Sequence, residues 1–335
     1  MHVGLVGAGR IGAFHAHTLQ ALEHVDRLTI ADAVPETARR VAAEVGATAA
    51  ESAEAMVDAG VDALVIATPT PAHAPLVELA AAAGLPAFCE KPVALELGTL
   101  DRVIATVEDA GIVVQVGFQR RFDPGYRRAR EAVADGSIGS LLALRAATHD
   151  PAPPAEAYIA RSGGIFRDLH IHDLDAIRFV TGLEIEEVYA DGSVRETPWF
   201  AAHGDVDTAA ALIRLEDGVL GVLTGTRHDA LGYDVRLELF GTADSAAVGL
   251  DDRTPLHSLE PSAGPTGKNG YRDFIDRFGA AYRAELAAFV ETVRDGGPSQ
   301  CGLGEARAAL QAALAADRSR TDRRPIRTGE IRAGS

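Results

Sequence analysis

Lys91 is the first residue whose type and position indicate chemistry. It stands in the segment Glu90-Lys91-Pro92, directly after residues 87–90, which are typical of a buried strand. The chain otherwise uses arginine and has only one other lysine, Lys268. An ammonium at the carboxyl edge of a parallel sheet can hold a reacting hydroxyl and stabilise its developing negative charge. This role is favoured over that of a solvated surface lysine.

A second set of candidate groups belongs to one segment in the middle of the chain. Asp168, His172 and Asp175 are four and then three residues apart, so a helix over 166–181 places them on one face. An imidazole beside a carboxylate is a proton acceptor suited to neutral pH. A capped helix with a surface ion pair is the alternative reading. We expect no metal, because a zinc site that also used His170 would need ligands two residues apart on a helix.

A glycine-rich sequence near the start of the chain predicts a dinucleotide site. Gly7-Ala8-Gly9-Arg10-Ile11-Gly12 matches G-x-G-x-x-G, follows a short apolar strand over 2–7 and opens a helix. In that context the glycines allow a tight turn and the approach of a pyrophosphate to the helix N-terminus. Asp32 ends the next strand, where a carboxylate binds ribose hydroxyls and repels a 2′-phosphate. NAD is therefore favoured over NADP, with Arg39 and Arg40 as the residues that complicate this choice.

The elements that must position these groups fall into two patterns. In the first 120 residues, unbroken apolar strands alternate with helices, which predicts a doubly wound parallel sheet of the Rossmann type in an α/β domain over 1–120. The expected strands are 2–7, 27–32, 62–67, 87–90 and 112–117. The first expected helix follows the glycine turn and ends near residue 23, and the others span 35–45, 73–83 and 96–110.

Residues 121–335 predict a second, α+β domain with a large open, mostly antiparallel sheet, whose C-terminal helix is free to pack back on the first domain. The turn at Glu216-Asp217-Gly218 is hairpin chemistry, and the polar tail after Arg320 is expected to fray. The expected strands are 141–148, 185–194, 206–216, 218–226, 234–241 and 245–250, and the expected helices are 124–135, 166–181, 271–295 and 303–318, with a proline-rich loop at 151–154.

The bulk composition limits the possible partners. A chain of 335 residues accommodates two domains, and its formal charge of −16 disfavours nucleic acid and anionic membranes as partners. We expect no membrane span and no leader, because no long apolar run occurs and the first strand begins at once. Cys89 and Cys301 are expected to be free thiols in a reducing cytoplasm.

Three motifs in order resemble the glucose–fructose oxidoreductase / inositol dehydrogenase family. They are the glycine-rich turn, Thr68-Pro69-Thr70 followed by His73, and Glu90-Lys91-Pro92. The sequences Val-Gly-Phe-Gln-Arg-Arg-Phe-Asp at 116–123 and Gly-Gly-Ile-Phe-Arg-Asp at 163–168 look like the inositol 2-dehydrogenase branch. The resemblance covers residues 1–330 and implies an NAD-dependent dehydrogenase of a cyclic polyol or sugar that forms dimers or tetramers.

The resemblance also implies roles for particular residues. Lys91 would bind the reacting hydroxyl, His172 would take its proton, and Asp168 would bind a neighbouring hydroxyl. Cofactor contacts are implied for the glycine turn and for Asp32, Thr68, His73, Glu90, Lys91 and Gln119. Substrate contacts are implied for Arg120, His149, Asp175, Tyr233 and Tyr282.

One loop departs from the inositol pattern and leaves the substrate open. The segment 148–154 carries Asp150 and three prolines where the myo-inositol enzymes are more basic. Another inositol isomer, or an aldose such as glucose, therefore remains open. An NADP-linked aldose oxidoreductase, a non-catalytic cofactor-binding sensor and a hydrolase that retains NAD as a redox catalyst are the alternatives.

Overall fold

The computed structural model describes residues 1–261 and 269–334, so Lys268 lies outside the described residues. The chain forms two compact units. The first comprises Met1–Gln119 and Ala280–Arg307, and the second comprises Arg120–Gly279 and Ala308–Ala333. Most of helix α10 (Phe274–Asp295) and the start of helix α11 (Leu303–Asp322) therefore belong to the first unit, within the range predicted for the second domain.

The first unit contains a six-stranded, wholly parallel sheet in the order β3-β2-β1-β4-β5-β6. This confirms the doubly wound architecture, although β3 and α3 were not predicted. The strands are β1 (His2–Val6), β2 (Arg27–Ala31), β3 (Thr48–Ala49), β4 (Ala63–Ile66), β5 (Ala87–Glu90) and β6 (Val114–Gly117), and the helices are α1 (Arg10–Ala21), α2 (Pro35–Val45), α3 (Ala53–Asp58), α4 (His73–Ala82) and α5 (Leu97–Ala110).

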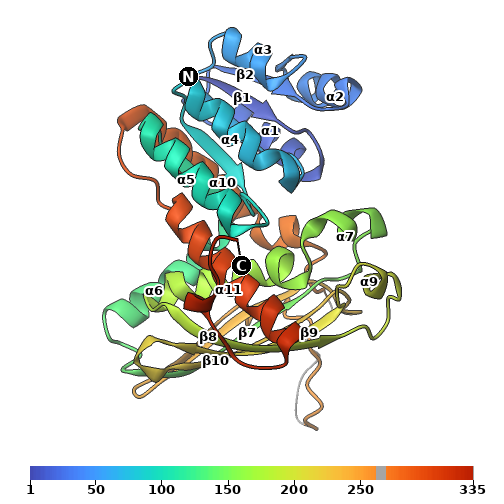
Figure 1. Cartoon of the computed structure of the whole chain (residues 1–335), viewed down its shortest axis with the longest axis vertical. Coiled ribbons are helices and arrows are strands. Elements are labelled where there is room, and N and C mark those ends of the chain that lie inside the picture. The colour runs from blue at the N-terminus through green and yellow to red at the C-terminus, as the bar shows by residue number, and fades with distance from the viewer. Residues whose placement is uncertain (262–268, 335) are drawn as a thin grey trace. The chain divides into compact units, whose positions relative to one another are not determined.

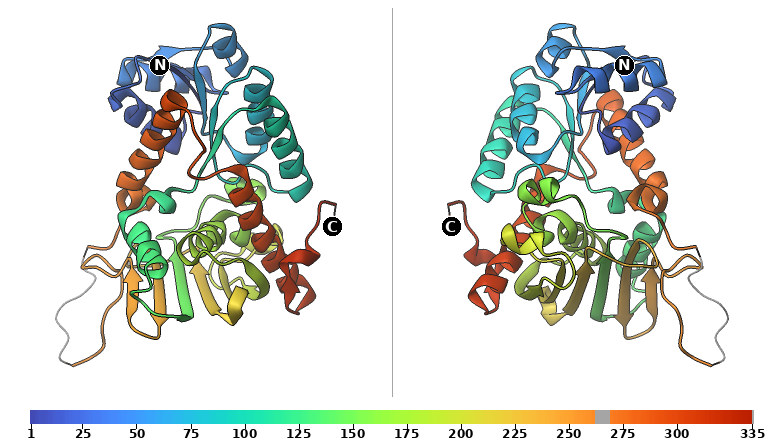
Figure 2. Two further views of the ribbon diagram at one scale, coloured as in Figure 1. Left: turned by 90° about the vertical axis from the view of Figure 1, so that its left-hand side faces the viewer. Right: turned by 90° about the vertical axis from the view of Figure 1, so that its right-hand side faces the viewer.

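Burial on both sides explains the unbroken apolar strands of this sheet. All four residues of β4 are buried, and Val3, Leu5 and Val65 are fully enclosed. Helices α1, α2 and α10 contribute to the core on one face, while α4 and α5 pack together on the other (Figure 2). The sheet is therefore a rigid base from whose carboxyl edge loops can present functional groups.

The second unit contains a seven-stranded sheet in the order β12-β11-β7-β10-β9-β8-β13. Within the described ranges, neighbouring strands pair antiparallel except β7 and β10, which pair parallel. The predicted mostly antiparallel sheet is thus confirmed. Its strands are β7 (Leu141–His149), β8 (Ile185–Ser193), β9 (Thr208–Leu215), β10 (Leu220–Thr226), β11 (Asp234–Gly241), β12 (Ser245–Val248) and β13 (Ile326–Arg327).

Helices cover one face of this second sheet (Figure 1). Alternate residues such as Val188, Ile213 and Leu223 point into the covered face and are buried. The helices are α6 (Pro124–Ala134), α7 (Glu156–Ser162), α8 (Ile171–Thr181) and α9 (Trp199–Ala202), together with the later part of α11, and a π-helical turn spans Phe166–His170. Short 3₁₀ turns span Thr70–Ala72 in the first unit, Gln119–Phe122 at the boundary of the two units in the sequence, and Glu216–Gly218 and Thr328–Glu330 in the second unit.

One prediction for the second unit was wrong, and one helix was not predicted. The tail after Arg320 does not fray: helix α11 runs to Asp322, and β13 then pairs with β8 and buries Ile326 completely. Burial of this one apolar residue supplies stabilisation that the polar composition of the tail did not indicate. The proline-rich loop is followed at once by helix α7, which was not predicted.

None of the helices in the described ranges is both long and apolar enough to cross a bilayer.

Candidate active site

The glycine turn between β1 and α1 has the geometry that a dinucleotide needs. A Cβ on Gly7, whose φ is +96°, would lie 2.5 Å from the Ala67 carbonyl oxygen, and one on Gly12 would lie 2.0 Å from the Gly7 carbonyl oxygen. A Cβ on Gly9 would meet no atom within 4 Å. Gly7 and Gly12 are therefore required by close packing, whereas the backbone at Gly9 is open to a ligand.

The N-terminus of α1 is suited to an anion. No side chain caps it, and no acidic residue stands in its first turn. Its backbone N–H groups and the positive end of the helix dipole therefore favour a pyrophosphate. Asp32 lies beside this turn, since its carboxylate accepts hydrogen bonds from the N–H groups of Ala8, at 2.7 Å, and Val34, at 2.8 Å. Each oxygen keeps a lone pair that can accept a ribose hydroxyl.

The carboxyl ends of β4, β5 and β6 bring further predicted residues to the same sheet edge. Thr68, Lys91 and Gln119 follow these three adjacent strands. Within the described ranges, Thr68 Oγ1 and Gln119 Oε1 are buried polar atoms with no hydrogen-bond partner. Buried polar atoms without partners are rare, so a ligand with hydroxyl and amide groups fits this edge.

His73 joins two of the loops at this edge. Its ring nitrogens lie 2.7 Å from the carbonyl oxygen of Thr68 and 2.8 Å from that of Pro92. Burial lowers the pKa of His73, so the neutral ring donates to one carbonyl at a time. His73 therefore holds the segment that follows Lys91, which is itself half-buried.

Asp168 is a carboxylate of the second unit whose two oxygens are both held by hydrogen bonds. It lies in the π-helical turn before α8 and is 7% exposed. Tyr158 on α7 donates a hydrogen bond to its Oδ1 at 2.6 Å, and Arg227 donates to its Oδ2 at 2.8 Å. The other terminal nitrogen of Arg227 binds Asp150 at 3.1 Å. These charge-assisted bonds favour the ionised form of Asp168 and fix its orientation.

A second set of buried, ion-paired side chains links β7 with α8. Arg120 donates to Asp173 at 2.5 Å and to the hydroxyl of Thr148 at 3.0 Å, and His170 donates to the other Asp173 oxygen at 2.8 Å. Burial alone would raise the pKa of Asp173, but Arg120 and His170 lower it to about 2. This group of fully buried partners anchors the helix that carries His172.

The remaining predicted substrate residues are placed as follows. His149 donates to the hydroxyl of Thr226, and burial lowers its pKa. Asp175 is fully buried and pairs with Arg121 at 2.7 Å. Tyr233 is also buried in the second unit, His172 is the half-buried second residue of α8, and Tyr282 lies on α10 in the first unit, where its ring packs against those of Phe14 and His15.

Sequence reasoning missed Arg227 and Tyr158. Arg227 and Asp150 directly follow Thr226 and His149, which are partners in the parallel pairing of β10 with β7. A hairpin reading of the strands gives no reason to place these two residues side by side. An arginine directly after an apolar strand was the available signal, but nearly all basic residues of this chain are arginine, so the residue type alone did not mark this position.

A parallel sheet with a glycine turn and Asp32, joined to a second unit with an oriented carboxylate, defines the class of nicotinamide-dependent oxidoreductases. Residues 1–118 match the family described as an oxidoreductase family with an NAD-binding Rossmann fold, and residues 126–247 match the GFO/IDH/MocA C-terminal domain. The chain belongs to this family, as the sequence motifs predicted, and its cofactor is NAD.

Relatives match the chain over nearly its full length. It is 41% identical to a myo-inositol dehydrogenase of Streptomyces leeuwenhoekii, covering 96% of this chain and 98% of that protein. It is 36% identical to a myo-inositol 2-dehydrogenase of Thermotoga maritima, covering 99% of each. The crystal structure of scyllo-inositol dehydrogenase from Lactobacillus casei, with bound NAD(H) and scyllo-inositol, superposes with a TM-score of 0.89 at 29% identity, covering 98% of this chain and 99% of that one.

Proposed function

We propose that this chain oxidises one ring hydroxyl of an inositol, with NAD as the hydride acceptor. The observation that carries the proposal is the oriented carboxylate Asp168, held by Arg227 and Tyr158 in a unit whose relatives act on inositols. An ionised carboxylate is a strong acceptor for a polyol hydroxyl. When bound, NAD supplies the redox chemistry by accepting a hydride at its nicotinamide ring.

Three residues carry the proposed reaction. Lys91 binds the oxygen of the reacting hydroxyl and stabilises the negative charge that develops on it. His172 accepts the proton of that hydroxyl at an imidazole nitrogen, and Asp168 binds a neighbouring hydroxyl so that the ring presents one carbon for oxidation.

The direct test is a panel of inositol isomers and aldoses with NAD, followed by the absorbance of the reduced cofactor. We expect the highest kcat/KM with an inositol. Lys91→Ala and His172→Ala should each lower kcat by at least about a hundredfold, in the range of a lost acid–base or charge-stabilising group, while NAD still binds. Near-normal turnover in either variant would show that its assigned role is wrong, and aldose preference would favour the sugar dehydrogenase alternative.

We also propose that the chain works as a homo-oligomer in the cytoplasm. On the uncovered face of the second sheet, Val222, Leu212 and Tyr189 lie in one cross-strand row, and each is at least 42% exposed. Leu220 continues the patch at 39% exposed. Contiguous exposed apolar residues mark interaction surfaces, and a second copy of the same sheet would cover this one. The free thiols of Cys89 and Cys301 are compatible with a reducing compartment.

A further inference from the structure

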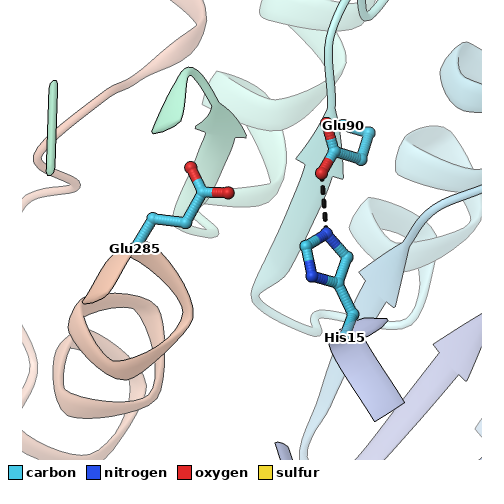
Figure 3. A group of neighbouring side chains, drawn as sticks. All are labelled: His15, Glu90 and Glu285. Atoms are coloured by element: carbon cyan, nitrogen blue, oxygen red, sulfur yellow. Dashed lines mark hydrogen bonds and ion pairs between the residues drawn. The ribbon is translucent and has the colours of Figure 1, made fainter. Parts of the chain in front are cut away.

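Three ionisable side chains of the first unit meet in its interior, away from solvent. His15 of α1, Glu90 at the end of β5 and Glu285 of α10 each offer one atom to a group whose members all lie within 4.8 Å of one another (Figure 3). His15 and Glu285 are fully buried, and Glu90 is 8% exposed. The reaction proposed above uses none of the three as an acid or base.

His15 and Glu90 form the bonded part of this cluster. The imidazole Nε2 donates to Glu90 Oε1 at 2.7 Å. The His15 ring is enclosed by the rings of Phe14, Phe88 and Tyr282. A hydrogen bond to a carboxylate in such low-dielectric surroundings is strong and has a fixed direction.

This bond connects two parts of the proposed active site. His15 belongs to α1, whose N-terminus is the glycine turn, and Glu90 is joined by one peptide bond to Lys91. We propose that His15 is a positioning residue, which holds Lys91 at a set distance from the glycine turn through Glu90, and that Glu285 stands beside this pair as a neutral carboxylic acid.

The surroundings of Glu285 support its neutral state. Neither of its oxygens has a hydrogen-bond partner within the described ranges, although Figure 3 shows the carboxyl directed toward the other two groups. The backbone of Glu285 is held by the Gln115 side chain of β6, which donates to the Glu285 carbonyl oxygen at 2.7 Å. An ionised carboxylate buried without partners is costly, and a second negative charge would repel Glu90. Burial, and then the charge of Glu90, raise the pKa of Glu285 well above its usual value.

The first experiment compares His15→Phe, His15→Gln and Glu285→Gln. His15→Phe keeps an aromatic ring among its neighbours but removes the donor to Glu90, so we expect kcat to fall at least about tenfold while the dissociation constant of NAD changes less than about threefold. His15→Gln retains a donor and should restore most of kcat. Glu285→Gln replaces a neutral acid by a neutral amide and should keep kcat within about twofold. Loss of stability alone, with normal kcat in the folded protein, would overturn the proposal.

Because the inference rests on the proposed function, a second readout must be independent of turnover. The chain has two lysines, Lys91 and Lys268, so reductive ¹³C-methylation gives two side-chain signals by NMR, apart from the N-terminal amine. We expect His15→Phe to move the Lys91 signal relative to the Lys268 signal. If the unmodified chain oxidises no inositol, the proposed function fails, but the NMR result still decides whether His15 positions Lys91. An unmoved Lys91 signal in His15→Phe would refute the inference alone.

A metal ion is the competing explanation for one imidazole and two carboxylates in contact. Elemental analysis of protein purified without chelators distinguishes the two. We expect less than about a tenth of an equivalent of any divalent metal. A stoichiometric metal that Glu285→Gln removes would overturn the neutral-acid assignment, because the side chain would then be an ionised ligand.

Discussion

Arg227→Met is the substitution that most directly tests how the second unit orients Asp168. Arg227 is 3% exposed and bridges Asp168 and Asp150. Removing one partner of a buried ion pair leaves the other charge uncompensated, at a cost of roughly 3–5 kcal/mol. Asp150 has a side chain 21% exposed and regains water, so its share is small. We therefore expect a loss of about 3 kcal/mol in the free energy of unfolding, at the lower end of that range.

The assay exploits the single tryptophan. Trp199 lies on α9 in the second unit, so its fluorescence during urea unfolding follows that unit specifically. We also expect turnover to fall, because Asp168 loses the donor that orients it. A displacement of its carboxylate by about 1 Å would lower kcat/KM roughly a hundredfold. Tyr158 still holds one Asp168 oxygen in this variant, which provides the matched comparison with Tyr158→Phe.

A double-mutant cycle decides whether the bridge is responsible. Asp168→Asn combined with Arg227→Met removes both charges, so the double variant should recover roughly 1–2 kcal/mol relative to the sum of the two single losses. Simple additivity of the two losses, or a cost below about 1 kcal/mol for Arg227→Met, would refute the view that Arg227 compensates a buried Asp168.

Three further predictions concern the cofactor, the assembly and pH. Asp32→Ala should raise KM for NAD roughly tenfold and narrow the preference for NAD over NADP, as steady-state kinetics with both cofactors will show; an unchanged ratio would count against Asp32 as the selector. Leu212→Glu should reduce the mass of the oligomer measured by light scattering, and an unchanged mass would exclude this face as the interface. Asp317, whose pKa burial raises to about 6 against the opposing effect of Arg167, binds its proton more tightly in the folded state. Stability should therefore fall by at most about 3 kcal/mol as pH rises from 4 to 6, and Asp317→Asn should remove this slope in urea unfolding at each pH.

Local sequence pattern predicted the parallel sheet of the first unit except β3, and only part of the second unit. The parallel strands were predicted because burial on both faces requires an unbroken apolar run. The glycine turn was predicted because its close packing requires glycine at fixed spacings. The parallel pairing of β7 with β10 was not predicted, since pairing between distant strands depends on the whole sheet rather than on either strand. The two-residue strand β13 was missed for the same reason, because its stabilisation comes from β8.

The motifs predicted groups that would face a ligand, but not the groups that hold them. Asp168 is oriented by Arg227, which is 59 residues away, and Glu90 is bonded to His15, which is 75 residues away. Arg227 and His15 are both buried. Loss of either side chain would leave the carboxylate that it holds without a hydrogen-bond donor. Substitutions at the two supporting residues should therefore resemble substitutions within the motifs in their effect on turnover. Substrate preference in such an enzyme can then change through residues that never touch the substrate, because they alter the orientation of those that do.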